Sequence, residues 1–165
     1  MNAKYLYTKN DEIKSRYDDF IKSQQKPILS MDFKIDKHDF IHTGKASSSI
    51  KFSLKRLGVD PAILRRIAIA SYEAEINVTA HSEGGIVKGN IYPEFVQILF
   101  VDNGPGIEDI EKCMQPGYST AIDLVREMGF GAGLGLPNIK KNADIMCINS
   151  TYGDHTELEI IIYFK

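Results

Sequence analysis

An acid and an amide, Glu73 and Asn77, stand four residues apart in the segment EAEIN. A helix is expected here, with an apolar stripe that includes Ile67, Ala74 and Val78. At about 100° per residue, both polar side chains fall on one edge of that stripe, roughly 40° apart. They would therefore lie beside the core and reach a neighbouring cleft. The alternative is a surface pair joined by a hydrogen bond between side chains one turn apart.

A second candidate is the turn DNGPGI at residues 102–107, which follows the apolar run FVQILFV. Asp102 stands where a buried strand is expected to end, and its carboxylate can accept a hydrogen bond from an exocyclic amine. Gly104 and Gly106 have no Cβ, so the turn can approach a flat ligand closely. The alternative is an ordinary tight turn after a strand.

Alternating glycines form the third candidate, GFGAGLGL, with Gly129, Gly131, Gly133 and Gly135. Backbone N–H groups in such a loop can surround phosphates, helped by the positive end of the helix expected to follow. The loop is not a dinucleotide-binding fingerprint, because no strand precedes it and the last position of GxGxxG falls on leucine. The absence of GK[ST] excludes a P-loop. The alternative is a glycine hinge.

Strands and helices must position these groups, and they follow one another without a strict βα alternation. Helices are predicted over about 43–57, 61–82 and 134–143. Gly58 should end the first of them, and Asp60 with Pro61 should begin the second. Strands are predicted at 31–36, 86–92, 95–102, 144–150 and 158–164. This order favours an α+β fold, a two-layer sandwich with helices on one face of a mixed, mostly antiparallel sheet.

The N-terminal segment differs from the rest in its high charge. Within residues 9–25, apolar residues from Ile13 to Ile21 recur at helical spacing, which predicts a short amphipathic helix outside the main domain. The expected division is a helical N-terminal arm at 1–28 and the main domain at 29–165.

Composition narrows the class of protein. The 165 residues are 43% apolar and 25% charged, which is typical of one globular domain. A net charge of −2 disfavours a nucleic-acid partner, and no apolar run approaches the roughly 20 residues that span a bilayer. The N-terminus has no apolar signal segment, and the two cysteines are too few for a disulfide scaffold. The expectation is a cytoplasmic protein that binds neither membranes nor nucleic acid.

The three motifs together resemble the GHKL ATPase superfamily of gyrase, the 90-class chaperones, mismatch-repair ATPases and histidine kinases. EAEIN is similar to the N-box of that superfamily, DNGPG to its G1 box and GFGAGLGLPNIKK to its G2 box. The resemblance covers about residues 31–165. It implies the Bergerat fold and binding of ATP or ADP with Mg²⁺. Within the superfamily, EAEINVTAH and the single-domain length look most like the branch of bacterial anti-sigma factors and switch-protein serine kinases.

The resemblance also implies a role for each motif residue. Glu73 would be the general base, Asn77 the magnesium ligand and Asp102 the adenine reader. Thr156 looks like the threonine that helps to hold adenine. The remaining residues expected to shape the nucleotide pocket and its lid are Gly104, Gly106, Ile107, Gly131, Gly133, Leu134 and Gly135. Val78 in place of a small alanine, and SEGG after His81, depart from the family pattern on the substrate side.

Three functions are compatible with these motifs. The first is an ATP-dependent serine/threonine protein kinase that phosphorylates or sequesters a small partner, an anti-anti-sigma-like protein or a sigma factor. The second is a nucleotide-gated anti-sigma-like binding module without significant turnover. The third, a histidine-kinase fragment, is disfavoured because His38 and His42 have only about 30 residues before them and lie near a strand end. A homodimer is compatible with the resemblance.

Other polar residues near the motifs have simpler interpretations. His81 matches the family's histidine, but a histidine near a helix end often only caps carbonyl groups. Ser119 and Thr120 lie between the two glycine motifs and are interpreted as loop residues rather than phosphate contacts. Lys140 and Lys141 are expected on a solvated helix face.

Overall fold

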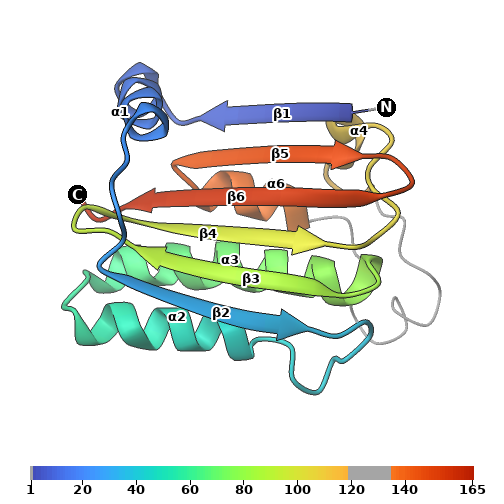
Figure 1. Cartoon of the computed structure of the whole chain (residues 1–165), viewed down its shortest axis with the longest axis horizontal. Coiled ribbons are helices and arrows are strands. Elements are labelled where there is room, and N and C mark those ends of the chain that lie inside the picture. The colour runs from blue at the N-terminus through green and yellow to red at the C-terminus, as the bar shows by residue number, and fades with distance from the viewer. Residues whose placement is uncertain (1, 119–134) are drawn as a thin grey trace.

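A six-stranded sheet forms the centre of the computed structural model, which describes residues 2–118 and 135–165. The spatial order of the strands is β1-β5-β6-β4-β3-β2, and every neighbouring pair is antiparallel (Figure 1). The strands are β1 (Asn2–Thr8), β2 (Leu29–Ile35), β3 (Gly85–Ile91), β4 (Phe95–Asp102), β5 (Ile145–Thr151) and β6 (His155–Tyr163). The predicted α+β class is confirmed, although the described strands contain no parallel pair to make the sheet mixed.

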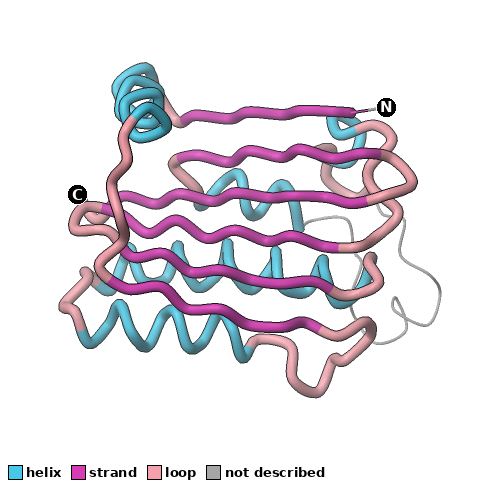
Figure 2. Tube along the Cα trace, viewed as in Figure 1, coloured by secondary structure: helices cyan, strands magenta, loops and turns pink. Residues whose placement is uncertain are grey.

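Three helices, α2 (Lys45–Arg56), α3 (Pro61–His81) and α6 (Gly135–Asn142), cover one face of this sheet, as predicted (Figure 2). Side chains alternate between the two faces of a strand, so residues two apart share a face. On β6, Leu158, Ile160 and Ile162 point into the core shared with these helices. That core also contains the fully buried Ile50 of α2 and Ile67 of α3.

Local capping chemistry determines where α2 and α3 meet. The Asp60 carboxylate accepts a hydrogen bond of 2.8 Å from the Ala62 amide, and Pro61 occupies the first helical position of α3. At the end of α2, Gly58 has a φ of +84°, and the amide of Val59 donates to the carbonyl of Leu54. This left-handed glycine with its returning hydrogen bond is a Schellman-type helix end. Both boundaries were predicted from the sequence.

Residues 2–22 belong to the sheet and its packing, which differs from the expected arm outside the domain. β1 pairs along its whole length with β5 and forms one edge of the sheet. Helix α1 (Asp11–Lys22) begins where predicted but packs on the face opposite to α2, α3 and α6. Its Ile13 and Tyr17 are buried in a second cluster with Tyr92, Phe95, Ile145, Ile161 and Tyr163. Helices therefore lie on both faces, not on one.

The short helix α4 (Ile110–Cys113) was not predicted. Asp109 caps it by accepting a hydrogen bond of 3.1 Å from the amide of Lys112. Across residues 2–118 and 135–165, none of the helices has the length and apolarity that crossing a bilayer requires.

Candidate functional site

The described residues predicted to bind nucleotide gather at one end of the sheet, on the right in Figure 1. Asp102 is the last residue of β4 and pairs in register with Thr156 of β6. The final turns of α3 carry Asn77, and α6 begins beside them at Gly135. Elements that are far apart in the chain thus meet at one place. Gly131, Gly133 and Leu134, together with Ser119 and Thr120, lie outside the described residues.

Glu73 and Asn77 present their polar ends to the start of α6. A Cβ added at Gly135 would lie 3.0 Å from Oδ1 of Asn77 and 3.4 Å from Oε2 of Glu73. The predicted pair is therefore brought together with the last glycine of the third motif. Oxygen atoms from both side chains stand against a helix N-terminus, which carries partial positive charge. An amide oxygen at this place can ligate Mg²⁺, and a carboxylate can accept a proton.

Asp102 lies in a partly dehydrated position beside its strand partner. Burial raises the pKa of its carboxyl group, while hydrogen bonds from the backbone of Gly104 and Thr156 act in the opposite direction. The amide of Gly104 donates to Oδ1 of Asp102 at 2.8 Å. When ionised, the side chain has further lone pairs that can accept a hydrogen bond from a bound base.

The glycines of the DNGPG turn are required by contacts within the chain. A Cβ at Gly104 would stand 2.8 Å from the Cβ of Ser82, at the end of α3. Gly106 has a φ of +72°, and a Cβ there would collide with the carbonyl oxygen of Thr151. The turn is thus held between the end of α3 and the β5–β6 connection, where Gly153 donates to the carbonyl of Pro105 at 2.5 Å. These glycines permit close approach to protein backbone, in addition to any ligand.

Ser150 of β5 connects this turn to Thr156 and was missed by the sequence analysis. Its hydroxyl is contacted by the amide of Ile107 at 2.8 Å and by Oγ1 of Thr156 at 2.8 Å. It also lies 3.0 Å from the carbonyl oxygen of His155. A single serine within a predicted strand does not indicate that its hydroxyl connects a turn to a neighbouring strand. Only the register, in which Ser150 pairs with Thr156, reveals it.

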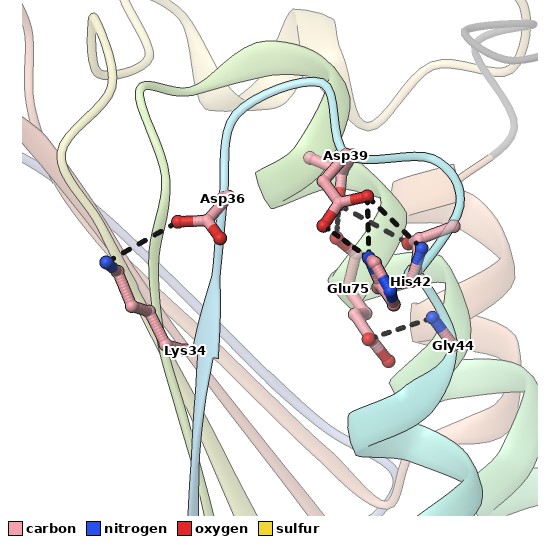
Figure 3. Close-up of polar contacts among 8 residues, drawn as sticks. Lys34, Asp36, Asp39, His42, Gly44 and Glu75 are labelled. Atoms are coloured by element: carbon pink, nitrogen blue, oxygen red, sulfur yellow. Dashed lines mark hydrogen bonds and ion pairs between the residues drawn. The ribbon is translucent and has the colours of Figure 1, made fainter.

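The second glutamate of EAEIN, Glu75, has a structural position that the sequence did not reveal. Its carboxylate is buried and accepts a hydrogen bond of 2.8 Å from the amide of Gly44 (Figure 3). It also accepts one of 2.9 Å from the amide of Ser47. Gly44 precedes α2 and has no side chain to cap it. Glu75 therefore caps α2 from a neighbouring helix, and its negative charge suits the helix N-terminus. Two residues apart on a helix, Glu73 and Glu75 point in very different directions.

His81 and Lys140 are two further polar residues near the site, and both are partly covered by neighbouring side chains. His81 ends α3, and burial lowers the pKa of its imidazole, helped by nearby His38. Lys140 was expected on a solvated face, but its Nζ lies 5.0 Å from the ring centroid of Tyr7, and a hydrogen bond with Tyr5 raises its pKa. The sequence did not reveal these aromatic neighbours of Lys140, because they lie on β1, a strand that was not predicted.

The chain is similar to known proteins in sequence and in fold. No family model matches the chain. The serine/threonine-protein kinase RsbT of Bacillus subtilis (strain 168) is 33% identical over 119 residues, which cover 67% of this chain and 80% of RsbT. The anti-sigma F factor of Thermoanaerobacter sp. (strain X514) is 33% identical over 112 residues, covering 64% of this chain and 75% of that protein.

Among solved structures, the SiaB-SiaC complex from Pseudomonas aeruginosa contains a chain with the same fold. The TM-score is 0.51 at 12% sequence identity, with 92% of this chain and 97% of that chain covered. This likeness supports the fold, while the relationship to RsbT extends over most of both sequences. The chain therefore belongs to the GHKL-type family of anti-sigma factors and serine/threonine-protein kinases.

Proposed function

We propose that this protein binds ATP with Mg²⁺ and transfers the γ-phosphoryl group to a serine or threonine of a small partner protein. The observation that carries the proposal is the meeting of Glu73, Asn77 and Gly135 at the start of α6. An acid, a metal-binding amide and a helix N-terminus make up the set of groups that phosphoryl transfer requires. The names of the relatives, a serine/threonine-protein kinase and anti-sigma F factors, support a kinase with a protein partner.

The adenine would lie over the paired ends of β4 and β6, with Asp102 and Thr156 reading its edge. Gly104, Gly106 and Ile107 would form the adjoining wall, since their turn is fixed between α3 and β5. Asn77 would hold Mg²⁺, which when bound neutralises phosphate charge. The N-terminus of α6 at Gly135 would face the phosphates.

Glu73 would act on the partner's hydroxyl group. Its carboxylate would take the hydroxyl proton as the serine or threonine oxygen bonds to the γ-phosphorus. The bond from that phosphorus to the β–γ bridging oxygen breaks, and ADP leaves. Positioning and charge stabilisation supply most of the rate enhancement in this class of reaction, and a positioned base adds about 10²–10⁴-fold.

A second function, sequestration of a partner under nucleotide control, is favoured by the relatives that are named anti-sigma F factors. In that case the same pocket would gate docking of a sigma factor or an anti-anti-sigma-like protein, and turnover would be incidental. A homodimer is also compatible with this proposal. Transfer of label from ATP distinguishes the two functions, because a gated binder changes partner affinity without phosphorylating the partner.

The deciding experiment incubates the protein with γ-labelled ATP, Mg²⁺ and small candidate partners encoded nearby, under single-turnover conditions. Glu73→Gln should bind ATP with nearly unchanged affinity and transfer phosphate about 10²–10⁴-fold more slowly. Glu83→Gln is a matched control, because Glu83 is exposed and pairs only with Lys37 among the described residues, at 2.7 Å. Wild-type rates in Glu73→Gln would end the general-base assignment, and failure of the wild type to bind ATP would end the proposal as a whole.

A further inference from the structure

Ser150, Thr156 and Asp102 form one row across three strands. Asp102 of β4 pairs in register with Thr156 of β6, which pairs in register with Ser150 of β5. Thr156 is on the same face of β6 as Leu158 and Ile160, which pack in the core beneath α2, α3 and α6. Residues paired in register share a face, so Asp102 and Ser150 also project toward this helical layer. Ser150 is only 2% exposed, and the proposed adenine readers lie beside it.

The three contacts of the Ser150 hydroxyl determine which atom donates in each. A serine hydroxyl has one proton and two lone pairs. The amide of Ile107 can only donate, so Oγ of Ser150 accepts from it at 2.8 Å. The carbonyl of His155 can only accept, so the single serine proton goes to it at 3.0 Å. In the remaining contact of 2.8 Å, Thr156 must therefore donate its own proton to Ser150.

This arrangement leaves Thr156 with lone pairs and no free proton. Asp102, when ionised, likewise has only acceptors to offer. Both proposed reading groups would thus present acceptors to a bound base. Adenine offers an exocyclic amine at its 6-position, whereas guanine and hypoxanthine carry an acceptor oxygen there.

We infer that Ser150 is a positioning residue that makes Thr156 an obligate acceptor and thereby selects 6-amino over 6-oxo purine nucleotides. The inference rests on the proposed nucleotide site and adds the element that sets its specificity. Ser150 itself touches no ligand. Its hydroxyl oxygen accepts a hydrogen bond from the Thr156 hydroxyl and another from the amide of Ile107 in the DNGPG turn.

The test measures ATP and ITP affinities by calorimetry for the wild type, Ser150→Ala and the control Ser71→Ala. ITP differs from ATP at the 6-position and at the adjoining ring nitrogen. In Ser150→Ala the freed Thr156 hydroxyl can rotate and donate to the 6-oxo group, so the ratio of ATP to ITP affinity should fall about 3- to 10-fold. Ser71 is equally buried and donates to the carbonyl of Ile67 at 2.6 Å within α3, so its loss should leave the ratio unchanged.

Thr156→Val provides a second route to the same answer. It removes the hydroxyl at nearly constant volume and should also lower the ratio, and adding Ser150→Ala to it should cause no further change. This variant decides the matter if Ser150→Ala does not fold, since an unchanged ratio in Thr156→Val overturns the inference.

The remaining outcomes separate the inference from the proposed function. A wild type that binds neither nucleotide refutes the nucleotide site itself. A wild type that binds ATP and ITP equally refutes the adenine-reading roles of Asp102 and Thr156 together with the role of Ser150. A Ser150→Ala protein that loses both affinities in parallel with thermal stability refutes only the role of Ser150. Retention of the full ATP preference in a folded Ser150→Ala protein does the same.

Discussion

Asp102 must satisfy opposing demands from folding and from ligand binding. Reading an adenine amine needs the ionised carboxylate, whereas burial raises the pKa of this group and favours its protonated form. For a carboxyl group with a raised pKa, the added stability is present below the ordinary value of 3.8 and is lost as pH rises through the pKa of the folded state. At neutral pH the ionised Asp102 therefore lowers the free energy of unfolding of the ligand-free protein.

Asp102→Asn should accordingly separate binding from stability. The variant offers an NH₂ donor toward the adenine amine, so ADP affinity should fall by about 1.5–3 kcal/mol, the scale of a hydrogen bond to a charged group. Without ligand, urea unfolding should show a variant more stable than the wild type at pH 7, with the difference shrinking as pH is lowered. Unchanged ADP affinity in calorimetry would remove the adenine-reader role.

Asn77 supplies the second prediction at this scale. Its Oδ1 lies at the start of α6, where it would be one of the few protein oxygens on Mg²⁺. In Asn77→Ala, ATP affinity should become nearly insensitive to added Mg²⁺, because that ligand is gone. Titrations with and without the cation check this, and a variant that keeps the full magnesium enhancement would mean that the cation is held elsewhere.

At the scale of elements, Glu75 joins α3 to α2 through the backbone amides of Gly44, Ala46 and Ser47. Glu75→Gln removes the charge from these hydrogen bonds, and we expect the free energy of unfolding to fall by about 1–3 kcal/mol. Chemical denaturation measures this loss. Glu73→Gln, two residues away and partly exposed, should unfold at nearly the wild-type midpoint. Equal stabilities of the two variants would contradict the capping role of Glu75.

The success of prediction also varies among elements for physical reasons. The boundary between α2 and α3 was predicted because Gly58, Asp60 and Pro61 act locally, through backbone conformation and neighbouring amides. β1 was missed because Asn2, Lys4 and Thr8 interrupt its apolar residues and because it is stabilised as a strand by pairing with the distant β5. The EAEIN, DNGPG and Gly135 positions lie at one end of the sheet, and their roles in nucleotide binding stay a prediction. Ser150 and Glu75 could not be found, because their partners are defined only by tertiary packing.

At the scale of the whole molecule, residues 2–22 add an edge strand to the sheet and cover the face opposite to α2, α3 and α6. Tyr17 of α1 hydrogen-bonds to Glu159 of β6, and Arg16 lies 3.8 Å above the Tyr163 ring centroid. Deleting this segment would expose the second cluster and leave β5 as an unpaired edge, which promotes aggregation. The truncated protein should melt at a lower temperature and sediment as larger species. A monodisperse truncation with the wild-type melting temperature would restore the view of a peripheral arm.

The pairing of β1 with β5 also affects how the chain folds during synthesis. Asn2 meets Thr151, so the first strand emerges from the ribosome long before its partner exists. At about 5–20 residues per second, the delay is on the order of 7–30 s. A strongly apolar strand left unpaired for that time would invite association with other nascent chains. Asn2, Lys4 and Thr8 interrupt the apolar residues of β1, and the charge of Lys4 in particular disfavours such association before β5 is available.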